Sequence, residues 1–251
     1  MNKYLKYLDR IEFVVTMCCT GKCRHCSEGE HTTGSPHIDT DIAVKTIKDV
    51  CSRYDIRSLM TFGGEPLLYP ETVAAIHKTA YEMGIPERDI ITNGYFSKDK
   101  KRIEQVASML RESHIQRVML SVDAFHQETI PLEPVELFAD TLKENGVYVE
   151  ISPAWLVDRN ADNPYNSVTS ELIGKFAAKG FEIGNGNVIF PQGNALKYLG
   201  EYFNEGEVVS NPYEESPYDI RSLCIGCDGS ALNGNLCEKD VLQLIEEYSP
   251  K

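Results

Sequence analysis

The sequence lacks two features that would each point to a particular class of protein. It has no apolar run long enough to cross a membrane, and its first ten residues lack the continuous apolar segment of a signal peptide. It also lacks an excess of positive charge, since 25 Lys and Arg oppose 38 Asp and Glu and give a net charge of −13. We therefore expect a cytoplasmic protein with no membrane partner. Because phosphate contacts need clustered Lys and Arg, we also expect no nucleic-acid partner.

The length and the cysteine content narrow the class further. A chain of 251 residues can bury a large core in one full-sized domain. Eight cysteines in a chain without a secretion signal predict reduced thiols and metal chemistry instead of disulfides. The acidic charge balance favours a small molecule, or a peptide of basic or neutral character, as the ligand.

Three of the cysteines lie within eight residues, directly after an apolar run at residues 11–16 that predicts a strand. They are Cys19, Cys23 and Cys26, and Gly21 between them gives the backbone the freedom that a tight loop needs. Thiolates are the preferred ligands of iron–sulfur clusters. Three ligands leave one iron of a four-iron cluster without a protein partner, and an open metal position is where a substrate or cofactor binds. A zinc loop or a chance group of reduced thiols is the alternative.

The spacing Cys-x3-Cys-x2-Cys at the end of a first strand resembles the signature of the radical S-adenosylmethionine (SAM) enzymes. The resemblance implies a [4Fe-4S] cluster on Cys19, Cys23 and Cys26, whose fourth iron is chelated by the amino and carboxylate groups of SAM. In that family the reduced cluster passes an electron into the sulfonium, and the resulting 5′-deoxyadenosyl radical abstracts a hydrogen atom. His25 stands where the family usually has an aromatic residue beside the adenine, which assigns it to the SAM site.

A second motif of the same family follows the next predicted strand, residues 58–62, without a gap. Consecutive glycines at the end of a strand let a ligand approach the backbone closely, and a carboxylate accepts from an ammonium group. The family binds the amino group of SAM with Gly-Gly-Glu-Pro at this place, so the resemblance assigns that role to Gly63, Gly64 and Glu65. Taken alone, the motif also suits a turn that leads into a helix.

Later strand ends supply further candidates for the SAM site and for catalysis. Asn93 ends the third predicted strand, and Ser121 and Asp123 end the fourth, where the family contacts the ribose or methionine part of SAM. For Asp123 the alternative is that it caps the following turn. His126 and Glu128 are of types that hold or protonate a substrate and are the candidates for a catalytic role. The alternative for both is an ordinary solvated loop side chain.

The pattern of strands and helices predicts the fold class. Strand and helix alternate six times up to residue 195, which indicates an α/β protein with a parallel sheet and helices outside. The motifs fall at the carboxyl ends of strands, the edge at which parallel α/β folds place their sites. The resemblance sharpens this to a partial (β/α)6 TIM-like barrel within a core domain of residues 1–195. Residues 181–190 are predicted to form its sixth strand, and residues 191–195 follow it as a loop without a predicted site residue.

Residues 196–251 are predicted to form a C-terminal extension that contains a β-hairpin and a helix. The spacing of Cys224, Cys227 and Cys237 around the hairpin resembles a shortened twitch or SPASM extension, which in some radical SAM enzymes holds an auxiliary iron–sulfur cluster. The full extension is longer and has more cysteines. The resemblance implies a second cluster on these three cysteines, with Cys18, the substrate or no group as the fourth ligand. A zinc site and a hairpin that only packs on the barrel are the alternatives.

Together these features predict a radical SAM enzyme that cleaves SAM reductively and abstracts a hydrogen atom from a peptide or small-molecule substrate. An electron donor such as a flavodoxin or ferredoxin is the other partner that the resemblance implies. Two alternatives remain open. The compact size also suits an activase of a glycyl-radical enzyme. A non-catalytic iron–sulfur or zinc redox sensor is the other, and it would leave Gly63, Gly64 and Glu65 without a task.

Overall fold

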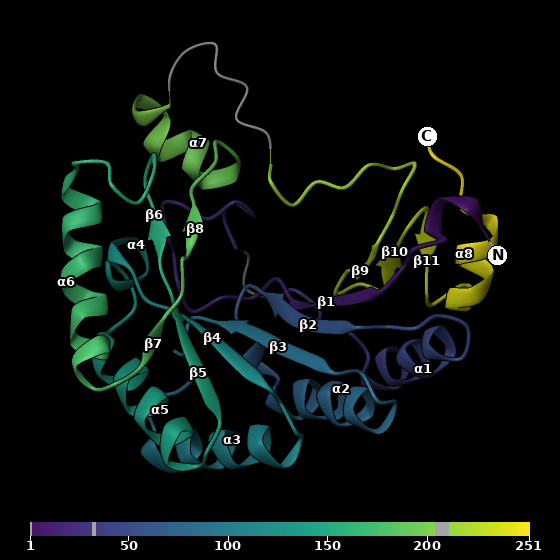
Figure 1. Cartoon of the computed structure of the whole chain (residues 1–251), viewed down its shortest axis with the longest axis horizontal. Helices are drawn as coiled ribbons and strands as arrows, with labels where there is room; N and C mark the ends of the chain where they lie inside the picture. The colour runs from purple at the N-terminus through teal and green to yellow at the C-terminus, as the bar shows by residue number, and fades with distance from the viewer. Residues whose placement is uncertain (1, 32–33, 204–210) are drawn as a thin grey trace.

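The computed structural model describes residues 2–31, 34–203 and 211–251. Within these ranges the chain folds into a curved sheet whose convex face is covered by helices (Figure 1). The central strands are parallel, lie side by side in chain order, and are β1 (Arg10–Thr16), β2 (Ser58–Gly63), β3 (Glu87–Thr92), β4 (Arg117–Ser121) and β5 (Tyr148–Ser152). The outer helices are α1 (Thr40–Cys51), α2 (Pro70–Glu82), α3 (Lys100–Glu112), α5 (Leu132–Glu144) and α6 (Pro164–Ala178).

The single strand predicted over residues 181–190 is divided into two short ones. β7 (Glu182–Ile183) pairs with β5 in the main sheet, whereas β8 (Asn187–Val188) pairs with β6 (Ala154–Trp155) in a separate sheet. Gly186 lies between them with a φ of +70°, and a Cβ there would stand 2.1 Å from the carbonyl oxygen of Pro153. The glycines therefore mark a sharp change of direction inside this segment, which breaks the strand.

The C-terminal segment extends the same sheet on the other side. β9 (Ser222–Ile225) runs parallel to β1, and β10 (Ser230–Ala231) and β11 (Gly234–Asn235) form the predicted hairpin beside it. The last helix, α8 (Val241–Glu247), follows near the N-terminus (Figure 1). Among the described residues the strand order is β11-β10-β9-β1-β2-β3-β4-β5-β7, which does not close. The predicted α/β partial barrel is confirmed, while the domain boundary at residue 195 stays a prediction.

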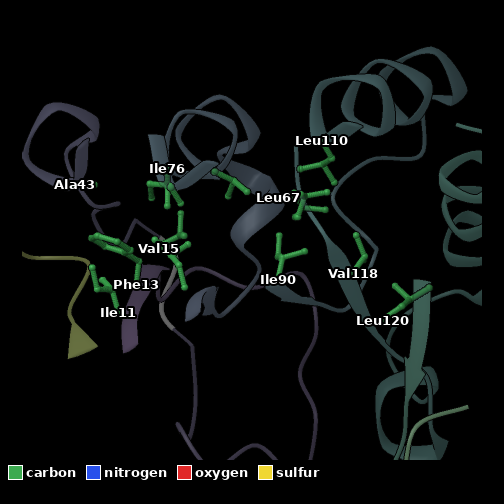
Figure 2. Close-up of a cluster of buried hydrophobic side chains, with 14 of the residues drawn as sticks. Ile11, Phe13, Val15, Ala43, Leu67, Ile76, Ile90, Leu110, Val118 and Leu120 are labelled. Atoms are coloured by element: carbon green, nitrogen blue, oxygen red, sulfur yellow. The ribbon is translucent and has the colours of Figure 1, made fainter. Parts of the chain in front are cut away.

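The core lies between the convex face of the sheet and the helices. Along β1, Ile11, Phe13 and Val15 are fully buried and point toward α1 and α2 (Figure 2). Because successive side chains of a strand alternate in direction, Glu12 and Val14 face the concave side. Each fully buried apolar side chain stabilises the fold by roughly 2 kcal/mol. No helix in the described ranges is long and apolar enough to span a membrane.

Four shorter elements complete the carboxyl edge of the sheet, where the predicted motifs lie. They are η2 (Pro66–Leu68), α4 (Ala124–Gln127), α7 (Gly193–Leu199) and η3 (Gly200–Tyr202).

Candidate functional site

The three cysteines of the motif lie on the loop that follows β1. They lie near enough for the charge of one thiolate to affect the pKa of another. Cys23 is only 7 % exposed; burial, together with nearby Asp123, Cys19 and Cys26, raises the pKa of its thiol. Burial raises the pKa of Cys19 to about 11, with contributions from Glu65 and Cys26, and also raises the pKa of Cys26. Buried thiolates that repel one another need a cation to offset their repulsion and desolvation. An iron cluster supplies that positive charge, so the donor set fits the predicted cofactor.

The glycine motif after β2 lies directly against the cysteine loop. The backbone N–H of Gly64 donates to the carbonyl of Thr16, and that of Glu65 donates to the carbonyl of Cys18, both at 2.8 Å. A Cβ on Gly64 would stand 2.3 Å from the Cys18 oxygen, and one on Gly63 would stand 2.4 Å from the Thr16 oxygen. Only glycine allows this approach, so the two motifs found in the sequence form one site.

Glu65 is a fully buried carboxylate whose negative charge has little compensation. Its Oε1 accepts from the backbone N–H of Leu67 at 2.9 Å and from the hydroxyl of Thr92 at 2.7 Å, and its Oε2 accepts from the backbone N–H of Asn93 at 2.9 Å. Burial nevertheless raises the pKa of Glu65 to about 7. Two carboxylate oxygens offer about four acceptor positions, so one remains. An ammonium group fits this position in both charge and hydrogen bonding.

Asn93 connects Glu65 to the cysteine loop. Its side-chain Nδ2 lies 3.5 Å from Sγ of Cys19 and donates to the hydroxyl of Thr20 at 3.2 Å, while its backbone N–H donates to Glu65. The residue is 5 % exposed. The structure therefore gives Asn93 a contact with the sulfur of Cys19, and its direct contact with SAM stays a prediction.

Asp123 is buried and already engaged by the protein. Its Oδ1 accepts from the backbone N–H groups of Phe125 and His126, and its Oδ2 accepts from the backbone N–H of Ala154 and lies 2.7 Å from Nδ1 of His126. Burial alone would raise the pKa of Asp123, but His126 and these donors lower it to about 2. Asp123 is thus the N-cap of α4, as the alternative interpretation of the sequence predicted. Ser121, at the end of β4, is 8 % exposed, and SAM contacts by both residues stay predictions.

His25, His126 and Cys23 come together at the ends of β1 and β4. One ligand atom from each lies within 4.8 Å of the other two, and the imidazole rings of His25 and His126 are 4.7 Å apart. Burial lowers the pKa of His25 to about 4, so this ring is neutral at pH 7. Within the described ranges its buried Nδ1 has no hydrogen-bond partner. Such an atom indicates an unfilled polar contact, which suits the SAM-site role predicted for His25.

Glu128 is held by the cysteine loop. Its carboxylate forms a two-pronged ion pair with Arg24, in which Nε of Arg24 donates to Oε2 at 2.9 Å. The Arg24 guanidinium also lies over the ring of Tyr165, 5.3 Å from its centre. Nearby, the backbone N–H of Lys22 donates to the hydroxyl of Thr129 at 3.0 Å. These contacts tie the cysteine loop to the segment that follows α4 and to α6, and the catalytic role of Glu128 stays a prediction.

The sequence interpretation missed Gly193 and Asn194, which the structure places on the cysteine loop. Asn194 donates to the carbonyl oxygens of Cys23 and Cys26. The only signal in the sequence was a glycine directly before a polar residue after the last predicted strand, a pattern common to many turns.

The C-terminal cysteines are distributed around the hairpin. Cys224 on β9 pairs with Glu12 of β1, and the sulfur of Cys227 lies 3.9 Å from the hydroxyl of Ser35, whose carbonyl accepts from the Cys18 thiol. In the part of the chain that the structure describes, neither Cys224, Cys227 and Cys237 nor the motif cysteines bring all three of their sulfur atoms within 4.8 Å of one another. The motif cysteines differ in that each is an electrostatic neighbour of another. The second cluster therefore stays a prediction.

Comparison with known proteins identifies the family. A family model described as the Radical SAM superfamily matches residues 13–154, more than half of the 251-residue chain. The chain belongs to the radical SAM superfamily. It is therefore an enzyme of a family that binds a [4Fe-4S] cluster and SAM, as the cysteine motif predicted.

Curated relatives match part of this radical SAM chain. It is 26% identical over 171 residues to a GTP 3′,8-cyclase of Clostridium perfringens, covering 64% of this chain and 51% of that protein. A GTP 3′,8-cyclase of Microcystis aeruginosa is 23% identical over 129 residues, covering 50% and 37%. The chain thus matches about half the length of the Clostridium perfringens relative and a smaller part of the Microcystis aeruginosa relative.

Solved structures share the fold over nearly the whole chain. AnSMEcpe with bound AdoMet superposes with a TM-score of 0.62 at 16% identity, covering 97% of this chain and 81% of that one. Streptococcus suis SuiB bound to S-adenosylmethionine gives a TM-score of 0.56 at 14% identity, covering 95% and 65%. At these identities the likeness shows the fold alone.

Proposed function

We propose that this radical SAM enzyme holds its cluster on Cys19, Cys23 and Cys26, cleaves SAM reductively, and abstracts a hydrogen atom from a peptide or small-molecule substrate. The observation that carries the proposal is the contact between the two motifs. Gly64 and Glu65 bond to the cysteine loop, and Glu65 is a buried carboxylate that lacks a strong cationic partner. When bound, the cluster and SAM supply the radical chemistry.

The chain's own residues position and shield these groups. Glu65 would take the ammonium group of SAM, and the neutral ring of His25, whose buried Nδ1 has no hydrogen-bond partner among the described residues, would contribute to the adenine site. His126 is oriented by Asp123 through the 2.7 Å contact at Nδ1, which leaves Nε2 to face a ligand. Ser121 and Asn93 complete the proposed SAM-binding set.

The concave face of the sheet argues for a neutral or cationic substrate. Arg117 is held between Asp89, at 2.5 Å, and Glu150, at 3.3 Å, and Arg10 pairs with Glu12 at 2.6 Å. These side chains alternate with buried residues such as Val118, so they face the concave side, with Arg10 and Arg117 at the amino ends of β1 and β4. Three carboxylates thus surround two guanidiniums that are already paired. This negative charge below the site would disfavour a polyphosphate that reaches into the barrel.

The relatives named GTP 3′,8-cyclase suggest a nucleotide as the second candidate substrate. Adding GTP, or a lysine-containing peptide, to cluster-loaded protein and measuring 5′-deoxyadenosine separates the two. We expect the peptide to stimulate its formation and GTP not to do so. Stimulation by GTP alone would contradict the argument from charge.

Serine substitution of single cysteines tests the cluster ligands. Cys23→Ser is expected to lose the iron of the motif cluster, about four irons per chain, and the change in absorption on adding SAM. Cys51→Ser is the matched control, because Cys51 lies on α1 and packs against the hydrophobic core. Equal iron loss in both variants would contradict the proposed ligand set. Iron uptake without any response to SAM would favour the redox-sensor alternative.

The C-terminal cysteines form the second proposed metal site, with an auxiliary cluster on Cys224, Cys227 and Cys237. The position of Cys227 supports this site, because its sulfur lies beside Ser35, whose carbonyl accepts from the Cys18 thiol. The test is iron content: about eight irons per chain indicate two [4Fe-4S] clusters, and about four indicate one. A flavodoxin or ferredoxin of the cytoplasm is the electron donor that this function requires.

A further inference from the structure

α7 contacts the cysteine loop through one buried residue, Asn194. The backbone N–H of Asn194 donates to the carbonyl of Cys26 at 2.9 Å, and its Nδ2 donates to the carbonyl of Cys23 at 3.1 Å. Asn194 is 7 % exposed. A single residue far along the chain therefore binds the backbone of two of the three motif cysteines.

Gly193 makes this contact possible. Its φ is +56°, and a Cβ there would stand 2.3 Å from the carbonyl oxygen of Ser27 and 2.7 Å from that of Cys26. Both the left-handed backbone and the close approach require glycine. Any larger residue would push α7 away from the loop, so this pair of residues fixes how close α7 lies.

The other side of α7 is fixed to the rest of the fold. Ala195 and Leu199 are fully buried in a second hydrophobic cluster with Phe125, Leu156 and Ile189. These partners come from α4 and from the segments around β6 and β8, which lie beside α7 (Figure 1). The cysteine loop is thus fastened to a helix that is itself packed in place.

We propose that Asn194 is a positioning residue of the cluster site. It holds the carbonyls of Cys23 and Cys26, so that the two thiolates keep their spacing, and a negative charge introduced at this position would disfavour the more negative, reduced state of a cluster bound there. Groups that orient metal ligands often matter nearly as much as the ligands. This inference rests on the proposed cluster ligation by Cys19, Cys23 and Cys26.

The test compares Asn194→Asp with wild type in the cluster-loaded full-length chain under anaerobic conditions. Asp has the size of Asn and keeps the backbone bond to Cys26, but its carboxylate cannot donate to Cys23. We expect iron release to a chelator to be about tenfold faster or more. We also expect the midpoint potential, followed by electron paramagnetic resonance, to become more negative. Leu196→Ala is the control on the same helix, because Leu196 is 58% exposed, and it should behave as wild type.

The outcomes separate this inference from the proposed function. If wild type takes up no cluster, the proposed function fails. If wild type is loaded and Asn194→Asp lowers only the denaturation temperature, with unchanged iron release, potential and spectrum, the role of Asn194 is merely structural and the inference is wrong. Should Asn194→Asp not fold, Asn194→Ser replaces it, because its shorter side chain cannot span to Cys23 and the same readouts decide.

Discussion

The side-chain amide of Asn93 lies 3.5 Å from Sγ of Cys19, and the backbone N–H of the same residue donates to Oε2 of Glu65 at 2.9 Å. One residue therefore contacts both a proposed cluster ligand and the carboxylate proposed to bind the ammonium group of SAM. Because Asn93 is 5 % exposed, both contacts are shielded from water, which strengthens them.

Asn93→Leu is expected to make the cluster harder to reduce. Leu has a similar size and keeps the backbone N–H on Glu65, but it removes the donor to Cys19. Hydrogen bonds to the sulfurs of a cluster help to set its reduction potential, and a donor stabilises the more negative, reduced form. We expect a more negative midpoint potential and SAM cleavage slower by about tenfold or more. A redox titration checks this, and an unchanged potential would show that the contact has no electronic effect.

The affinity for SAM is expected to depend on pH through Glu65. Burial raises its pKa to about 7, so the carboxylate is largely protonated below that pH. Binding an ammonium group requires the ionised form, and SAM affinity should therefore fall by about tenfold per pH unit below about 7 and level off above it. Without SAM, the contribution of Glu65 to folding stability is fully present at low pH and is lost as the pH rises through about 7.

Spectral titration with SAM at several pH values measures this dependence in cluster-loaded protein. Glu65→Gln serves as the matched variant, because it keeps the shape of the side chain and has no charge to titrate. It should bind SAM more weakly and show no such slope. A slope of equal size in Glu65→Gln would assign the titration to another group.

Gly64→Ala is expected to disrupt the site, because its Cβ would stand 2.3 Å from the carbonyl oxygen of Cys18. Overpacking of this kind destabilises a protein by roughly 1–3 kcal/mol, and here it should also reduce iron retention. Gly174→Ala in α6 is the control, since a Cβ there meets nothing within 4 Å. Denaturant unfolding and iron analysis measure both effects. Normal iron content in Gly64→Ala would refute the close contact between the motifs.

Glu128→Gln is expected to have a small effect on catalysis if Glu128 only pairs with Arg24. A catalytic role for Glu128 would give a large effect. The side chains of Arg24 and Glu128 are 40% and 33% exposed, and pairs of this exposure contribute about 0–1 kcal/mol. We therefore predict a change of less than about tenfold in the rate of 5′-deoxyadenosine formation. A loss of several orders of magnitude would instead establish Glu128 as a catalytic residue.

The sequence predicted those features that depend on neighbouring residues. The cysteine spacing and the glycines before Glu65 are local patterns, and both motifs lie at the carboxyl edge of the sheet, in contact with each other. The parallel sheet followed from strand and helix periodicity in the same way. The chemistry of the family could therefore be recognised from residues alone.

The remaining features depend on contacts between distant segments. The pairing of β9 with β1 joins residues more than two hundred positions apart, and nothing in the short run Ser222–Ile225 specifies its partner. Asn194 was missed for the same reason, because its role depends on the carbonyls of Cys23 and Cys26. Asp123 was assigned to SAM by resemblance, whereas its four donors are visible only once α4 and β6 are in place.

The central claim is tested most directly by 5′-deoxyadenosine formation. The wild-type chain is rebuilt anaerobically with iron and sulfide and given SAM and a strong reductant, with the proposed peptide class of substrate present. We expect 5′-deoxyadenosine from the wild-type chain, with about four or more irons per chain, and no 5′-deoxyadenosine from Cys23→Ser. A fully iron-loaded protein whose cluster spectrum does not respond to SAM, and which forms no 5′-deoxyadenosine, would contradict it.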